Sequence, residues 1–479
     1  MWIALQIMKY FFCLFMIVAI SLAGCRNQNA SRNNFDIVLI TIDTLRADHL
    51  SCYGYERETS PHIDAIAKQG ILFKNTIAPS SWTAPSMVSL FTSTYPINHG
   101  VIHGLPFQKT IGLIQEVFSE KLASLPTILK RHGYTTFGVS SNHTLTAELG
   151  FARGFDYFKY VSWPAATIIN KIVYSWEDEI KKTDKFFLWI HYIDPHGPYE
   201  PQSPWIKQYT TENQHNIREI SRLSLMPWGA LLSDIKKNPK TLSTVLALYD
   251  SEINYVDACL GELIERLSLD KNTLLIVTSD HGEQFMEHGN IGHSIDLHKE
   301  ELHVPLIIKL PGVSKAQAIE RQVSLVDVMP TILGLCNIDQ PEHMVGKPLL
   351  ENAGPRAFPK EALPIGQAPA YNFAELDSAI LKAIITPQWK YIYDYEHETG
   401  ELYNIISDPF EQIDLIDTHP AQADNLKDQL FLWMAQARRF PPKNHLLQLS
   451  PDEKEKLETL GYLSSPEKEI DNNDGVANK

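Results

Sequence analysis

The chain has 479 residues, of which 44% are hydrophobic and 21% are charged, and its formal net charge is −15. This length and composition predict a globular protein with one large domain and one smaller domain. The 57 acidic residues outnumber the 42 basic ones, and no basic run is present, which argues against a nucleic-acid partner.

The N-terminal segment predicts export. It contains the stretch MKYFFCLFMIVAISLAGC, whose apolar core is too short for a comfortable membrane span. We expect a signal peptide over residues 1–24 and a polar linker over residues 25–34. The ending LAGC resembles a bacterial lipobox, which implies a lipid on Cys25 and attachment to the cell envelope, and Arg26 after it favours the outer membrane. An ordinary signal peptide with an incidental cysteine is the alternative.

Three apolar runs predict buried strands. They span residues 37–42, 186–192 and 274–278. Polar residues that could bind a ligand follow each run: Asp43 after the first, Asp194 and His196 after the second, and Asp280 and His281 after the third. Between the second and third runs, residues 249–267 carry apolar side chains at spacings of three and four, typical of an amphipathic helix.

This alternation predicts an α/β fold, a doubly wound and mostly parallel sheet flanked by helices, over residues 35–338. Ligands of such sheets bind beyond the carboxyl ends of the strands, so the polar residues should converge on one crevice. Residues 339–463 predict a smaller C-terminal α+β subdomain. It has short strands, turns at Thr386-Pro387 and Thr399-Gly400, and a helix near 420–438. The polar residues 464–479 predict a disordered tail.

Asp43, Asp280 and His281 offer two carboxylates and one imidazole, which suit a divalent cation. Each residue also has a structural explanation, as a cap or as part of a turn. Thr83, in the stretch SSWTAPSMVSLFTS, allows two interpretations. Its hydroxyl could cap a helix. It could also act as a nucleophile at a helix N-terminus, where backbone N–H groups would hold an anionic ester.

Stretches along nearly all of the mature chain resemble the sulfatase family of the alkaline phosphatase superfamily. They include FDIVLITIDTLRADHL, FFLWIHYIDPHGPYEP, TSDHGEQFMEHGNIGHS and WKYIYDYEHETGELYNI. The resemblance implies that the metal ligands are Asp43, Thr83, Asp280 and His281. It also implies that Thr83 is the nucleophile and that His196, His293 and His143 are catalytic candidates. One divalent ion is expected (zinc, manganese, calcium or magnesium), and Asp194, His196 and His293 offer a possible second site.

The chain departs from the family pattern at several of these positions. Sulfatases usually carry Cys or Ser where Thr83 stands, converted to formylglycine, and Arg where Met87 stands. Threonine has a single hydrogen on Cβ, so the same oxidation would yield a ketone. Thr44 stands where many sulfatases have a second aspartate, the lysine expected near Ser141 is missing, and His293 stands where many sulfatases use a lysine. Superfamily members that cleave or transfer phosphoesters use threonine directly.

The sequence therefore leaves three alternative functions open. The first is a metal-dependent hydrolase of sulfate or phosphate esters of small molecules or glycans. The second is a phosphodiesterase or phosphoalcohol transferase acting on envelope glycans or lipids. The third is a non-catalytic binding protein of the sulfatase type. The segment 203–240, with Trp205, Tyr209 and Trp228, is expected to form a lid or pocket wall, and the three remaining cysteines are expected to be buried free thiols.

Overall fold

The computed structural model describes residues 35–101, 107–108, 112–200, 203–225, 228–269, 272–350, 371–376 and 381–447. The predicted signal peptide, the linker, Cys25 and the C-terminal tail lie outside the described residues. Within the described ranges, no helix combines the length and the apolar character that crossing a membrane requires. Cys52, Cys259 and Cys336 are free thiols, but only Cys259 is fully buried.

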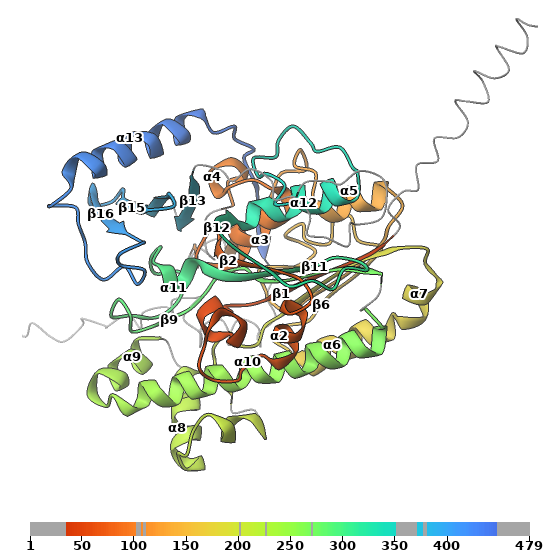
Figure 1. Cartoon of the computed structure of the whole chain (residues 1–479), viewed down its shortest axis with the longest axis horizontal. Helices are drawn as coiled ribbons and strands as arrows, with labels where there is room; N and C mark the ends of the chain where they lie inside the picture. The colour runs from red at the N-terminus through yellow and green to blue at the C-terminus, as the bar shows by residue number, and fades with distance from the viewer. Residues whose placement is uncertain are drawn as a thin grey trace, which may run out of the picture.

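An eight-stranded sheet forms the middle layer of the large domain (Figure 1). In spatial order its strands are β12 (Gln317–Ser324), β2 (Ile71–Ile77), β11 (His303–Lys309), β8 (Thr273–Ser279), β1 (Asp36–Ile42), β7 (Phe186–Tyr192), β5 (Thr135–Ser140) and β6 (Tyr157–Tyr160). All neighbours are parallel except β11, which runs antiparallel to both β2 and β8. The predicted α/β fold is confirmed, and the three predicted strands are β1, β7 and β8 to within one residue at each end.

Helices cover both faces of this sheet (Figure 1). One face carries α2 (Pro61–Ala67), α6 (Ala166–Ser175) and α10 (Lys240–Leu267), and the other carries α3 (Thr83–Thr92), α5 (Leu125–Arg131) and α12 (Val328–Leu335). Alternation along β1 produces the two cores: Ile37 and Leu39 join one hydrophobic cluster, and Val38 and Ile40 join the other. The predicted amphipathic helix is the second part of α10.

Shorter elements complete the large domain. The helices are α4 (Pro96–His99), α7 (Glu177–Lys182), α8 (Gln214–Ser224), α9 (Trp228–Lys237) and α11 (Lys299–Leu302). The 3-10 helices are η1 (Ala47–His49), η2 (Ser51–Tyr53), η3 (Trp205–Gln208) and η4 (Leu325–Asp327). β9 (Gln284–Phe285) pairs with β10 (Ile291–Gly292), and β4 (Gly112–Val117) pairs with β3 (Phe107–Gln108) and β17 (Lys443–Leu447).

The smaller C-terminal subdomain is an antiparallel sheet with one helix, as predicted. Its strands, in order, are β13 (Asn372–Leu376), β14 (Leu381–Ile385), β15 (Trp389–Asp394) and β16 (Thr399–Asn404), and its helix is α13 (Pro420–Gln436). The turn predicted at Thr399-Gly400 is wrong, because these residues begin β16. The reversal occurs at residues 395–398, where Glu398 adopts a left-handed φ of 55° that closes the hairpin.

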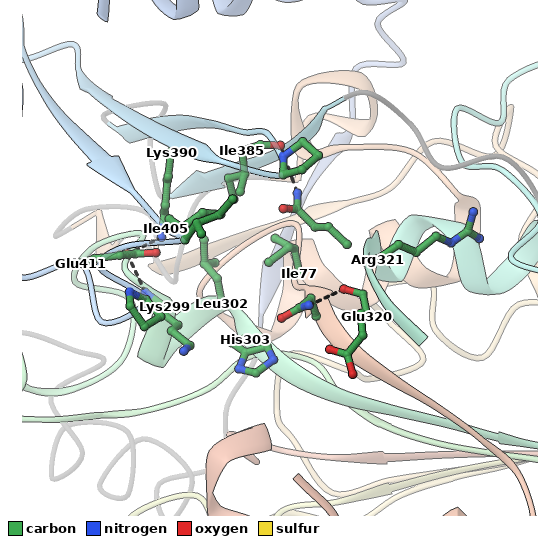
Figure 2. Close-up of a pocket in the computed structure, with 15 residues that line it drawn as sticks. Ile77, Lys299, Leu302, His303, Glu320, Arg321, Ile385, Lys390, Ile405 and Glu411 are labelled. Atoms are coloured by element: carbon green, nitrogen blue, oxygen red, sulfur yellow. Dashed lines mark hydrogen bonds and ion pairs between the residues drawn. The ribbon is translucent and has the colours of Figure 1, made fainter. Parts of the chain in front are cut away.

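A cavity of about 320 Å³ lies between the large sheet and the C-terminal sheet (Figure 2). Its lining includes the side chains of Lys390 and Glu411, which form a buried ion pair of 2.7 Å. The Glu411 carboxylate also accepts a hydrogen bond from the backbone N–H of Lys299 at the start of α11. This pair therefore connects the loop after β16 to the large domain.

We predict that Glu411→Gln lowers the free energy of unfolding by about 3 kcal/mol, because it leaves the Lys390 ammonium buried without a counter-charge. Replacing both partners, as Lys390→Met with Glu411→Gln, should restore most of the loss. Denaturant titration of the two variants measures the difference. Equal destabilisation of the single and double variants would contradict the role given to the charge.

Candidate functional site

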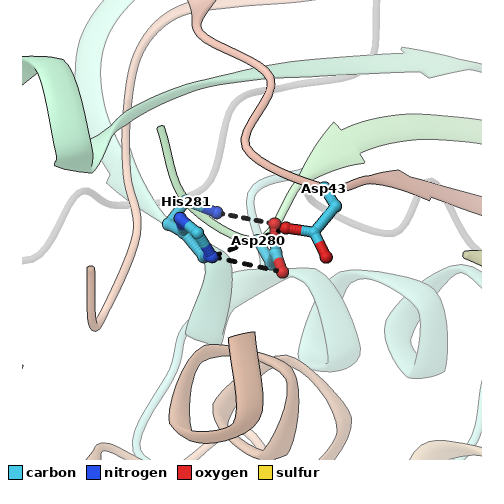
Figure 3. Close-up of side chains that lie close together, drawn as sticks. All are labelled: Asp43, Asp280 and His281. Atoms are coloured by element: carbon cyan, nitrogen blue, oxygen red, sulfur yellow. Dashed lines mark hydrogen bonds and ion pairs between the residues drawn. The ribbon is translucent and has the colours of Figure 1, made fainter. Parts of the chain in front are cut away.

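Asp43, Asp280 and His281 lie together at the carboxyl ends of β1 and β8 (Figure 3). Both strands are adjacent and parallel, and Ile42 pairs with Ser279, so the residues that follow are neighbours. Each of the three side chains offers a ligand atom within 4.8 Å of the others, and all three are fully buried. In the part of the chain that the structure describes, no other group of three carboxylate, imidazole or thiol side chains has this geometry.

Thr83 is the first residue of α3, and its hydroxyl faces this cluster. Thr83 Oγ1 lies 3.3 Å from His281 Nε2. Trp82 occupies the N-cap position instead, so capping does not account for the threonine. One turn along, Ser86 Oγ donates a hydrogen bond of 2.6 Å to the backbone oxygen of Asp280, which ties the start of α3 to the end of β8.

Asn142, which follows β5, connects the hydroxyl to the carboxylates. Its Nδ2 donates to Asp43 Oδ2 at 2.7 Å and to Thr83 Oγ1 at 3.2 Å. The orientation of the amide is defined, because Oδ1 accepts from both the backbone N–H and the hydroxyl of Thr144. Thr83 Oγ1 is therefore a hydrogen-bond acceptor with its oxygen held beside the cluster.

His191, on β7, completes the floor of the site. Its Nε2 lies 3.7 Å from Asp43 Oδ2 and 3.7 Å from Asp280 Oδ2. Ser141 Oγ donates to the backbone oxygen of His191 at 2.8 Å, so it must accept the 3.0 Å hydrogen bond from Nδ1 of the same ring. Nδ1 is then a donor, and Nε2 faces the two carboxylates.

The electrostatics around Asp43, Asp280 and His191 favour the binding of a positive charge. Burial and the charge of Asp280 raise the pKa of Asp43 well above its usual value. For Asp280, burial is outweighed by His281 and His191, which hold its pKa below the usual range. Asp43 Oδ1, Asp280 Oδ2 and His191 Nε2 are buried polar atoms for which the structure shows no hydrogen-bond partner. The donor set and its unpaired atoms fit a divalent cation.

Three further imidazoles extend from the cluster. The ring of His293 lies 4.6 Å from that of His281 and 4.8 Å from that of His196. His293 Nδ1 donates to Glu283 Oε1 at 2.9 Å, which orients the ring. Burial lowers the pKa of His293 to about 4. Burial, together with the neighbouring histidine in each case, lowers the pKa of His196 and of His143 to about 3. All three rings are neutral near pH 7.

The alternative second metal site is not assembled. The Asp194 carboxylate accepts the backbone N–H of Ala166 at 2.9 Å, at the start of α6, and does not join His196 and His293 in a ligand cluster. The physical reason is that the carboxylate already satisfies a helix N-terminus. Burial raises the pKa of Asp194 to about 7.

The structure also locates Met87 and two aromatic side chains of the segment 203–240. Met87 is fully buried in the hydrophobic cluster that contains α3, so an apolar side chain stands where sulfatases carry arginine. In the predicted lid, Trp205 packs against Tyr255 of α10, and the hydroxyl of Tyr209 donates to the backbone oxygen of Glu58. Both aromatic side chains thus have packing partners within the chain, and their assignment to a lid or pocket wall stays a prediction. The structure does not describe the side chain of Trp228.

Sequence reasoning missed Asn142, His191 and Glu283 as members of the site. Asn142 lies two residues beyond β5, whose sequence TTFGVS is buried but is not a continuous apolar run, so the signal that marks Asp43 is weak here. His191 lies inside an apolar strand, where one histidine normally indicates a buried structural residue. Glu283 follows the Asp280-His281 pair closely and reads as part of a turn.

Comparisons with known proteins identify the family of the chain. Residues 36–338 match the family model "Sulfatase", and residues 287–439 match "N-sulphoglucosamine sulphohydrolase, C-terminal". Among curated relatives, the ulvan-active sulfatase of Formosa agariphila is 25% identical over 84% of this chain and 82% of its own length. Arylsulfatase K of Bos taurus is 31% identical over 63% of this chain and 65% of its own length.

Solved structures share the fold. The phosphonate monoester hydrolase of Agrobacterium radiobacter superposes with a TM-score of 0.64 and 19% identity, over 87% of this chain and 98% of that one. A protein solved with its substrate D-glucosamine-2-N,6-O-disulfate also has a TM-score of 0.64 and 19% identity, over 84% of this chain and 98% of that one. Because the family model spans most of the large domain and the relatives extend beyond it, the chain belongs to the sulfatase family of ester hydrolases.

Proposed function

We propose that the chain is a metal-dependent hydrolase of anionic esters in which the unmodified Thr83 attacks the ester directly. The observation that carries the proposal is the position of the Thr83 hydroxyl. It lies at the N-terminus of α3, receives a hydrogen bond from Asn142 and faces His281. The cognate positions of sulfatases hold a residue that can become formylglycine, which threonine cannot.

Asp43, Asp280 and His281 would hold the cation, with the Thr83 hydroxyl as a further ligand and His191 Nε2 beside both carboxylates. A bound divalent cation would neutralise the carboxylates and lower the pKa of a neighbouring hydroxyl. Two carboxylates with an imidazole suit zinc or manganese better than calcium or magnesium.

Side chains of the protein supply the nucleophile and the proton donor. Thr83 loses its proton to solvent and Oγ1 attacks the sulfur or phosphorus, the bond to the leaving oxygen breaks as that oxygen takes up a proton, and a threonine ester forms. Water then displaces Thr83 from that ester. His196, His293 and His143 are the candidates for protonating the leaving oxygen. They are neutral in the free protein, and the negative charge of a bound ester favours their protonated form.

Two observations bear on the substrate. The relatives with this family pattern are sulfatases, several of them named for sugar substrates, which supports a sulfate ester of a glycan or a small molecule. Thr83 and the apolar Met87 instead favour phosphoester chemistry, either by a phosphodiesterase or by a transferase acting on envelope glycans or lipids. A non-catalytic binding protein is the remaining candidate.

We predict that Zn²⁺ or Mn²⁺ raises the thermal unfolding midpoint of the mature chain. A ligand present at 100 times its Kd stabilises by about 2.7 kcal/mol. Asp43→Asn and Asp280→Asn should abolish this response. Asp156→Asn, which changes a carboxylate beside Lys130, should retain it and serves as the control. An unchanged cation response in Asp43→Asn would contradict the proposed site.

We predict that Thr83→Ala loses at least about 10³-fold in kcat, because it removes the nucleophile, whereas Thr83→Ser retains part of the activity. The assay compares aryl sulfate, phosphate monoester, phosphodiester and phosphonate monoester as substrates of the metal-loaded protein. Faster phosphoester turnover would identify phosphoester chemistry as the principal activity. Turnover that survives in Thr83→Ala would refute direct attack, and no Thr83-dependent turnover of any ester would leave the binding-protein hypothesis.

We also propose that the mature chain is anchored to the cell envelope, with the outer membrane favoured, by a lipid on Cys25. The motif LAGC after an apolar segment supports it. Cys25→Ser should move the protein from the membrane fraction to the soluble envelope fraction of cells that express it. Unchanged fractionation of this variant would argue for a different means of attachment.

A further inference from the structure

Trp163 has a backbone conformation that bulky side chains rarely adopt. It follows β6 and has a left-handed φ of 49°. Its backbone N–H donates to the oxygen of Ser141 at 3.1 Å, which holds the residue beside the carboxyl end of β5. A glycine at this position would adopt the same backbone without strain.

Left-handed residues other than glycine recur around the site. Thr44 (φ 55°) directly follows Asp43, and Ser294 (φ 61°) directly follows His293. Strain of this kind persists where the surrounding structure enforces it, and it concentrates at functional sites. Trp163 is the one large aromatic residue among the positions of positive φ in the described part of the chain.

The indole of Trp163 lies against two of the candidate catalytic histidines. Its ring stacks on that of His143, with centroids 5.9 Å apart and planes inclined by 15°. It meets the ring of His196 edge to face, with centroids 4.8 Å apart. On the other side of the indole, the series of rings continues from His196 through His293 to His281, so two imidazole rings stand between the indole and the cation cluster in this series.

Core packing does not explain this arrangement. Trp163 is half-buried, and it belongs to none of the hydrophobic clusters of the described residues and is not among the partly buried side chains packed against them. Trp176 and Trp205, in contrast, both pack against the cluster that contains α10. All the histidines of this series are buried, so the half-buried indole is its most exposed member.

We propose that Trp163 forms a subsite for the leaving group, which binds an alcohol that contains a ring, a pyranose or an aryl group, by stacking on the indole. The inference rests on the proposed function and deepens it. His196 is a candidate donor to the leaving oxygen and contacts Trp163 directly, so a ring attached to that oxygen falls on the indole. Flat apolar faces of rings pack well on indole, whereas a short acyclic alcohol gains little contact there.

The experiment separates ring binding from anion binding. The full-length mature chain carrying Thr83→Ala and loaded with Zn²⁺ is titrated calorimetrically with glucosamine 6-sulfate and, separately, with inorganic sulfate. Glucosamine 6-phosphate and inorganic phosphate form a second matched pair. Adding Trp163→Gly should weaken binding of the sugar ester about tenfold and leave binding of the inorganic anion unchanged. Trp163→Phe should recover most of the loss, and Trp205→Phe is the control.

A second measurement distinguishes a binding role from a structural one. Trp163→Gly should keep or raise the thermal unfolding midpoint, because glycine relieves the strained φ. Equal weakening of sugar ester and inorganic anion, or a fall in the midpoint with sugar binding intact, would overturn the subsite. Because these titrations use Thr83→Ala and need no turnover, a failure of direct attack by Thr83 does not decide their result.

Discussion

Two aspartates, Asp43 and Asp280, are fully buried side by side because β1 and β8 are adjacent parallel strands that end at the same level. Burial and the repulsion between two negative charges in a region of low dielectric both raise the pKa of Asp43 well above its usual value. Much of the rest of the site follows from this constraint. The surrounding groups include buried polar atoms without a hydrogen-bond partner and the three imidazoles of His143, His196 and His293, whose lowered pKa values keep them neutral.

The elements around the pair place each group by ordinary backbone rules. Ser86 fixes α3 against the backbone of Asp280, so the Thr83 hydroxyl meets the cluster at a helix N-terminus. Ser141 fixes the tautomer of His191, and Thr144 fixes the amide of Asn142. A nucleophile, a charged floor and several neutral imidazoles are thereby held by contacts that do not depend on the substrate.

The departures from the family pattern change the charge of the site more than its shape. With Met87 in the core and histidine at position 293, the groups that lie against the cluster are imidazoles and an amide. Imidazoles gain positive charge only when an anion is bound, whereas lysine and arginine carry it permanently. The positive charge of the site therefore comes from the bound cation and from imidazoles that become protonated when the anionic substrate binds. This arrangement suits direct attack by an unmodified threonine.

The sequence by itself determined the fold class, the two strand ends that carry Asp43, Asp280 and His281, and the helix that begins at Thr83. Buried strands in parallel sheets are apolar runs with abrupt polar ends, and such ends can be read locally. Only the tertiary structure decided that His191 and Asn142 complete the cluster, that Asp194 serves a helix terminus, and that Trp163 stands in a strained turn beside His196. These outcomes depend on contacts between residues far apart in the chain and on backbone angles, and neither leaves a local pattern in the sequence.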